Sequence, residues 1–138
     1  MNEQKIRLRV VTVMTDTDGE KHESKTVHHG TLEEKDGGME LTYEQMLEGV
    51  RAKITLIQEA DCIQMRRTGE MSGALRFESG KQTKGIYTTI YGEIPVSIYT
   101  NQTEVIRTES GGEMKLDYDI FVAGERTGSS RMTLTWRL

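Results

Sequence analysis

Cysteine, proline and the largest aromatic residues are scarce in this chain. Among its 138 residues there are one cysteine, one proline, one tryptophan and two phenylalanines. A lone cysteine, Cys62, excludes an internal disulfide and favours a reducing compartment over a secretory one. Because no histidine lies near Cys62 in the sequence, a structural thiol is favoured over a catalytic nucleophile.

Long apolar runs and an excess of one charge are also absent. No segment approaches the roughly 18 apolar residues that span a bilayer, and the first residues lack the pattern of a signal peptide. The 18 basic and 22 acidic residues leave a net charge of −4, with no run of basic residues. We therefore expect a soluble, unprocessed, cytoplasmic protein that binds neither nucleic acid nor membrane.

Motifs for catalysis and for cofactors are missing too. The chain contains no G-x-S-x-G, P-loop or G-x-G-x-x-G motif. Its three histidines, His22, His28 and His29, do not have the spacing of a tetrahedral metal site. The segment DTDGE at 16–20 lacks the glutamate that completes a calcium loop. We expect a turn there, and no metal or cofactor.

Short segments of alternating polarity fill the chain instead. Turn signals recur about every 8 to 12 residues and include many of the 14 glycines, a spacing typical of sandwiches and barrels. Closure into a barrel would remove the exposed edges of such a sheet. We predict one all-β domain over residues 1–138, a closed antiparallel up-and-down β-barrel of about 8 to 10 strands. A two-sheet sandwich is the alternative.

The pattern of residues 43–48 fits both a strand and a helix. Alternation continues from MELTYEQ at 39–45 and favours a strand. However, Thr42 to Gln45 also matches a capping box, and Gly49 is a suitable helix stop. The sequence does not choose between strand and helix here.

The N-terminal strand is expected to contain a β-bulge. Ile6, Leu8 and Val10 share one face, but Val11 and Val13 continue the apolar pattern on the other face. One extra residue in the strand would restore a single apolar face.

The last hairpin has the clearest pattern. A loop at Arg126–Gly128, with Gly128 at the position that favours a positive φ, would set Tyr118 opposite Trp136. The same register would set Asp117 opposite Arg137, so that apolar meets apolar and acid meets base. We predict this register, with Tyr118 and Trp136 both inside the barrel.

Several motifs resemble those of a known family. The similar segments are residues 41–45, 66–100 and 111–124, and the specific positions are Arg67, Gly69, Phe77, Gly80, Thr83, Gly85, Tyr87, Thr89, Tyr91 and Gly92. Together they resemble the YwiB-like family of small bacterial proteins, a domain of unknown function. The resemblance covers most of the chain and implies a lipocalin-like, or calycin-like, closed barrel in the cytoplasm. It implies no established ligand or activity.

The preferred functional hypothesis is a non-catalytic barrel that binds a small, partly apolar molecule in its interior. The residues expected to line that interior are Tyr43, Tyr87, Tyr91, Tyr118 and Trp136. Either Arg66 or Arg67 is expected to contact an acidic group at the mouth.

The first alternative is a solid barrel that serves protein interaction or homodimerisation, with Phe121 and Ile57 on its outside. An enzyme is the weakest alternative, because it needs a titratable interior group.

Overall fold

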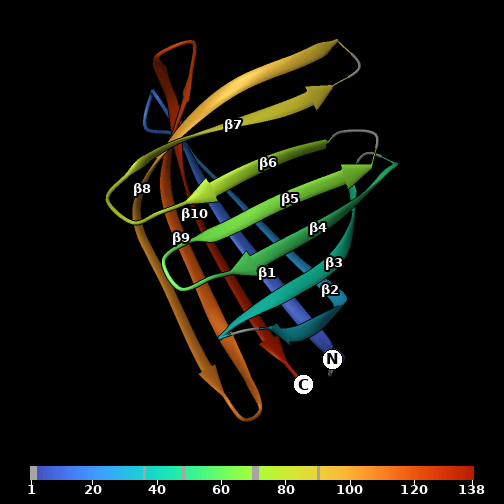
Figure 1. Ribbon diagram of the computed structural model, residues 1–138. Coiled ribbons are helices and arrows are strands. Elements are labelled where there is room, and N and C mark those ends of the chain that lie inside the picture. The colour runs from blue at the N-terminus through green and yellow to red at the C-terminus, as the bar shows by residue number, and fades with distance from the viewer. Residues whose placement is uncertain (1–2, 36, 48, 70–71, 90) are drawn as a thin grey trace.

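Ten antiparallel strands close into one barrel (Figure 1). The computed structural model describes residues 3–35, 37–47, 49–69, 72–89 and 91–138. The strands are β1 (Glu3–Asp16), β2 (Lys21–Lys35), β3 (Gly38–Leu47), β4 (Val50–Gln58), β5 (Ile63–Gly69), β6 (Ser72–Phe77), β7 (Gln82–Thr89), β8 (Gly92–Thr108), β9 (Gly111–Val122) and β10 (Glu125–Arg137). Each strand pairs with the next, and β1 pairs with β10. The prediction of a closed all-β up-and-down barrel is confirmed.

The alternating residues separate into an inner and an outer face, as the period of a strand requires. Inward-facing apolar side chains form one buried cluster, which includes Leu8, Leu41, Leu56, Leu116 and Leu134. Trp136 belongs to the same cluster and is 2% exposed. No helix among the described residues has the length and apolarity needed to cross a bilayer.

The two ends of the barrel interior differ. Near the end where β8 meets β9, the large inward-facing side chains of Met114, Leu134 and Trp136 are at most 2% exposed, and we call this the filled end. At the other end, where β1 turns into β2 and β9 into β10, inward-facing Met14 and Ile94 are 46% and 42% exposed. Side chains that point inward and still meet water show that this end is accessible to solvent, and we call it the open end.

Residues 43–47 form part of a strand and not a helix. They belong to β3, which pairs with β4 from Met39–Gln58 to Leu47–Val50. Residue 48 lies outside the described residues. The helix alternative is therefore wrong over 43–47, because pairing with β4 satisfies the backbone and directs Leu41 and Tyr43 into the core. A local capping box cannot replace both the strand pairing and the burial of these side chains.

The expected bulge in the N-terminal strand is also wrong. Strand β1 pairs in continuous register with β2 and with β10. Val11 and Val13 lie on the outer face, where both are half-buried. Their apolar character thus reflects partial cover on the outside of the barrel, and no extra residue is inserted.

The register of the last hairpin differs from the prediction by six residues. Glu125 pairs with Val122, so the turn is Ala123–Gly124, with φ of 53° and 82°. A bulge follows between Arg126 and Gly128. The predicted loop at Arg126–Gly128 and the predicted Tyr118–Trp136 pair are therefore wrong. Because six is an even number, both side chains still point inward, and both are buried.

Thr100 carries the one orphaned hydroxyl that we find among buried side chains of the described residues. It lies on β8 opposite Tyr118, is fully buried, and its Oγ1 has no hydrogen-bond partner. An unpaired buried hydroxyl costs stability, whereas a methyl group of the same shape does not. We expect Thr100→Val to raise the free energy of unfolding by about 1 kcal/mol, measured by urea denaturation. A loss of stability would show that the hydroxyl is satisfied in solution.

Candidate functional site

A row of inward-facing residues crosses five neighbouring strands near the open end. Tyr43 on β3 pairs with Ile54 on β4, Ile54 with Arg67 on β5, Arg67 with Gly73 on β6, and Gly73 with Tyr87 on β7. Adjacent strands lie about 4.8 Å apart. Arg67 is therefore flanked by a tyrosine two strands away on each side.

Gly73 makes room for one of these tyrosines. A Cβ atom placed on Gly73 would lie 2.5 Å from Cδ1 and 2.9 Å from Cε1 of Tyr87. The aromatic ring of Tyr87 therefore occupies the space that a side chain on β6 would fill. Because β6 separates β7 from β5, this packing directs the Tyr87 ring towards Arg67.

Tyr118 lies beneath this row and belongs to β9, further round the barrel. Its ring meets that of Phe77 on β6 in an edge-to-face contact, with centroids 4.8 Å apart and planes at 62°. Strands β6 and β9 are not neighbours, so the contact crosses the interior. The Tyr118 phenol also forms a hydrogen bond with the side chain of Ser130. Tyr118 and Phe77 thus separate the Arg67 row from the filled end.

The three phenols remain protonated well above neutral pH. Burial raises the pKa of Tyr43 to about 12, although the positive charge of Arg67 acts in the opposite direction. Burial also raises the pKa of Tyr87 and of Tyr118, again against the effect of Arg67. All three phenols are within electrostatic reach of one guanidinium. We call Tyr43, Arg67, Tyr87 and Tyr118 the tyrosine–arginine cluster.

Arg67 has no acidic partner in the described part of the chain. Eight other basic side chains form ion pairs with carboxylates, but Arg67 is not among them. An arginine side chain is always charged and offers five donors. A neutral phenol can donate a hydrogen bond as well. The tyrosine–arginine cluster therefore presents one positive charge and several donors, which is the chemistry that binds an anion.

His28 adds an aromatic side chain to the same end. Its ring lies 4.8 Å from that of Tyr43, tilted by 38°, and its Nε2 is 2.9 Å from Oγ1 of Thr26. Burial lowers the pKa of His28, so the imidazole is neutral at pH 7. The spacing of the three histidines did not place His28 in a site. Its inward position follows from the β2 register, which the weak pattern of that segment did not reveal.

The predicted site residues do not all gather in one place. Tyr43, Arg67, Tyr87 and Tyr118 come together as described. Tyr91 is 93% exposed at the β7–β8 turn, so its predicted place in the interior is wrong. Trp136 is buried at the filled end, opposite Gly112 on β9. Six residues separate Gly112 from Tyr118, so Trp136 is about 20 Å from Tyr118 along the strand direction.

Of the two predicted arginines, only Arg67 faces the interior. Ile63 and Met65 are buried and share the inward face of β5 with Arg67. Arg66 has the opposite parity, is exposed, and approaches Gln64 on the outside, with Nη2 and Oε1 3.5 Å apart. The period of the strand therefore selects Arg67 for the mouth.

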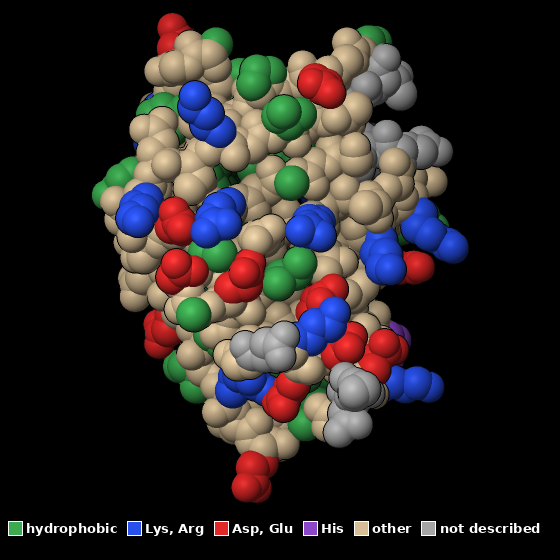
Figure 2. Space-filling view, in the orientation of Figure 1, with side chains coloured by type: hydrophobic (Ala, Val, Ile, Leu, Met, Phe, Trp, Pro, Cys, Tyr) green, Lys and Arg blue, Asp and Glu red, His purple; other side chains and the backbone are tan. Residues whose placement is uncertain are grey.

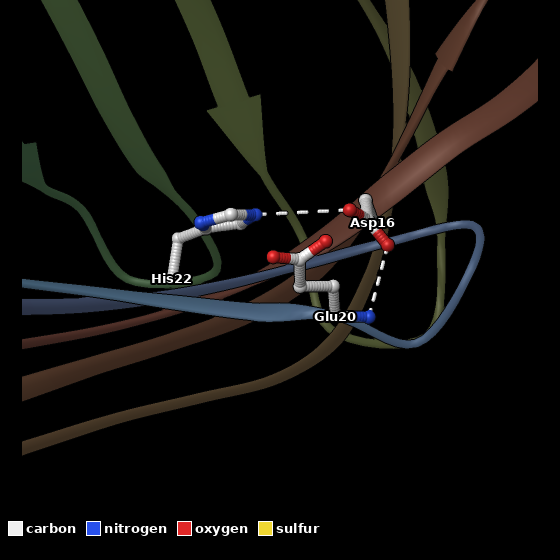
Figure 3. Close-up of side chains that lie close together, drawn as sticks. All are labelled: Asp16, Glu20 and His22. Carbon is white, nitrogen blue, oxygen red and sulfur yellow. Dashed lines mark hydrogen bonds and ion pairs between the residues drawn. The ribbon is translucent and has the colours of Figure 1, made fainter.

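Asp16, Glu20 and His22 form a separate group at the β1–β2 turn (Figure 3). Their ligand atoms lie within 4.8 Å of one another, and Glu20 and His22 are exposed. Asp16 Oδ1 accepts hydrogen bonds from the backbone N–H groups of Asp18 and Glu20 at 3.0 and 2.9 Å. These contacts are those of an Asx turn, and they account for the group without a ligand.

Cys62 shows no sign of reactivity, and neither Phe121 nor Ile57 is unusually exposed. The Cys62 thiol is buried, and burial raises its pKa, which disfavours the nucleophilic thiolate. Phe121 and Ile57, the basis of the interaction-module alternative, are both half-buried. Neither forms an exposed apolar patch by itself.

The fold and the cluster define an up-and-down β-barrel with one filled end and one open, tyrosine-lined end. The chain belongs to the family described as "Domain of unknown function (DUF1934)", which matches residues 8–134. The predicted resemblance to YwiB-like proteins is confirmed. The crystal structure of ywiB protein from Bacillus subtilis is similar, with a TM-score of 0.88 and 23% identity, and the alignment covers 98% of this chain and 92% of that chain. At this identity the similarity concerns the fold alone. No curated protein matches the chain.

Proposed function

We propose that the open end of the barrel binds a small, partly apolar molecule through an anionic group. The observation that carries the proposal is an inward-facing Arg67 that lacks an acidic partner among the described residues and lies near three protonated phenols. An unpaired charge at a half-buried position is costly. A ligand anion would offset that cost and accept hydrogen bonds from the cluster.

Apolar side chains on the adjoining strands supply the second half of the proposed site. Ile94, Ile120 and Val122 point inward from β8 and β9 near the same end, and Ile94 pairs directly with Tyr87. Ile120 and Val122 pack against the core only in part. A ligand with an apolar body and one acidic group would match both halves.

Binding fits the cluster better than catalysis does. Its three phenols are protonated at neutral pH, and the neutral His28 is engaged with Thr26. The lone Cys62 thiol is protonated as well. We therefore propose a ligand-binding protein rather than an enzyme. The cytoplasm, where a single free thiol persists, is its proposed location.

A matched pair of probes tests the proposal. Octanoate and octan-1-ol have the same chain length and differ in charge. We expect octanoate to bind about ten times more tightly, because charge-assisted hydrogen bonds contribute about 1.5 kcal/mol or more. Tyrosine ring signals in NMR are the suitable readout, because the only tryptophan lies at the filled end.

Two neighbouring arginines provide the variant and its control. Arg67→Gln should remove the preference for octanoate and leave binding of octan-1-ol, whereas Arg66→Gln should change neither. Native mass spectrometry of freshly purified protein would detect a molecule that is already bound. The proposal is wrong if both probes leave the tyrosine signals in place and the purified protein has only its own mass, or if Arg67→Gln keeps the preference.

A further inference from the structure

Four basic side chains gather on the outer face of β1 and β10, near the filled end. Arg7 on β1 lies directly opposite Arg137 on β10, and Lys5 and Arg9 flank Arg7 on the same face of β1. All four are exposed. We call them the arginine patch. Along the sequence they alternate with apolar residues, and Arg137 is 130 positions from Arg7, so only the closed barrel brings them together.

Among the described residues, this patch has no acidic partners. Elsewhere on the outer face, cross-strand pairs join opposite charges, such as Arg131 with Asp117 at 3.4 Å and Arg126 with Asp119 at 3.3 Å. Figure 2 shows a face on which basic and acidic side chains intermingle in this way. In the described part of the chain, no carboxylate lies within 4.0 Å of a patch nitrogen.

The register explains this lack of partners. Arg7 faces His29 on β2 and Arg137 on β10, and Arg9 faces Val27 and Thr135. Like charges directly opposite each other destabilise a sheet. The chain carries 22 acidic residues and a net charge of −4, so acids are available to the fold, but none lies directly opposite Arg7 or Arg9.

The patch also encloses a groove. Its volume is about 510 Å³, and it is lined by Arg7, Arg9, Val27, Thr135 and Arg137. Val27 is 65% exposed and gives the groove an apolar part. Arg7 and Arg137 also line a second groove of about 380 Å³ with Lys5 and His29. Arg7 and Arg137 therefore lie between two grooves, each of a size that fits a small molecule.

We propose that the arginine patch binds a small anion that carries two or more phosphate groups. Guanidinium groups bind phosphate oxygens in bidentate geometry. Directly opposed side chains start about 5 Å apart, so Arg7 and Arg137 can contact adjacent phosphates, with Arg9 available to a third. A single negative charge would leave the repulsion only partly offset. This site is separate from the open end and does not depend on the function proposed there.

Inorganic tripolyphosphate is the probe, and the thermal midpoint of unfolding is the first readout. We expect tripolyphosphate to raise the midpoint of the parent protein, and an equal concentration of orthophosphate to do so less. Arg7→Gln and Arg137→Gln should each weaken tripolyphosphate binding by about tenfold in calorimetry. Binding of the parent should weaken as salt is added.

Arg131→Gln is the matched control. It removes an arginine from the same face of β10, but one that is paired with Asp117, so tripolyphosphate binding should remain. Without any anion, Arg7→Gln and Arg137→Gln should unfold at the same temperature as the parent or higher, because they relieve a like-charge pair. The proposal is overturned if tripolyphosphate does not bind, if the control loses as much affinity as the patch variants, or if both patch variants are less stable without anion.

Discussion

Replacing Trp136 by alanine is expected to lower the free energy of unfolding by about 3–5 kcal/mol, as for other buried aromatic residues. The indole lies in the buried cluster and is 2% exposed. It fills the space above Gly112, where an added Cβ would be 2.4 Å from the ring carbon Cζ2. Alanine at 136 would leave a cavity that this closed, filled end cannot collapse to remove.

Urea denaturation of the parent and of Trp136→Ala measures this loss. Trp136→Phe should cost less, because a smaller ring still fills part of the space. Met46→Ala, which removes a side chain that is 61% exposed, is the control and should change stability by less than about 0.5 kcal/mol. Equal stability of parent and Trp136→Ala would contradict the burial of the indole.

Raising the pH from about 9.5 to about 11.5 is expected to remove about 2 kcal/mol of stability through Tyr43 alone. Burial raises the pKa of Tyr43 from 10.0 to about 12, so the folded state holds the phenolic proton more tightly than the unfolded state. The contribution is fully present below pH 10 and is lost as the pH rises to about 12. Each pKa unit corresponds to about 1.4 kcal/mol.

Tyr87 and Tyr118 add losses in the same direction, because burial raises the pKa of both. The measurement is the free energy of unfolding in urea at pH 9.5 and at pH 11.5. Tyr43→Phe keeps the ring beside His28 but removes the phenol, so its stability should fall less between these values. Identical slopes for the parent and Tyr43→Phe would count against the buried, protonated phenol.

The last hairpin shows what a period-two pattern predicts and what it does not. Alternation correctly predicted that Tyr118 and Trp136 point inward, but it did not predict which residues pair. Asp117 meets an arginine in both registers, since Arg131 and Arg137 are six positions apart on the same face. Cross-strand charge matching therefore could not distinguish them. The Ala123–Gly124 turn decided the register, although its first residue is an alanine at positive φ, which sequence rules disfavour.

The candidate site was predicted in part for the same reason. Tyr43, Tyr87 and Tyr118 were expected inside from alternation, and all three point inward. Residue type alone did not distinguish Tyr91 from these three, because a tyrosine is equally suited to a strand and to an exposed turn. His28 was missed because the residues around it on β2 are mostly polar, so that no apolar row marked its inward face.

By itself, the sequence determined that the chain is all-β and that its strands have one apolar and one polar face. These are local properties, because the direction of a side chain on a strand depends only on parity. Only the tertiary structure decided which residues meet across the barrel. Arg67 joins tyrosines from three other strands, and Arg7 meets Arg137, because closure brings together side chains that no local pattern relates.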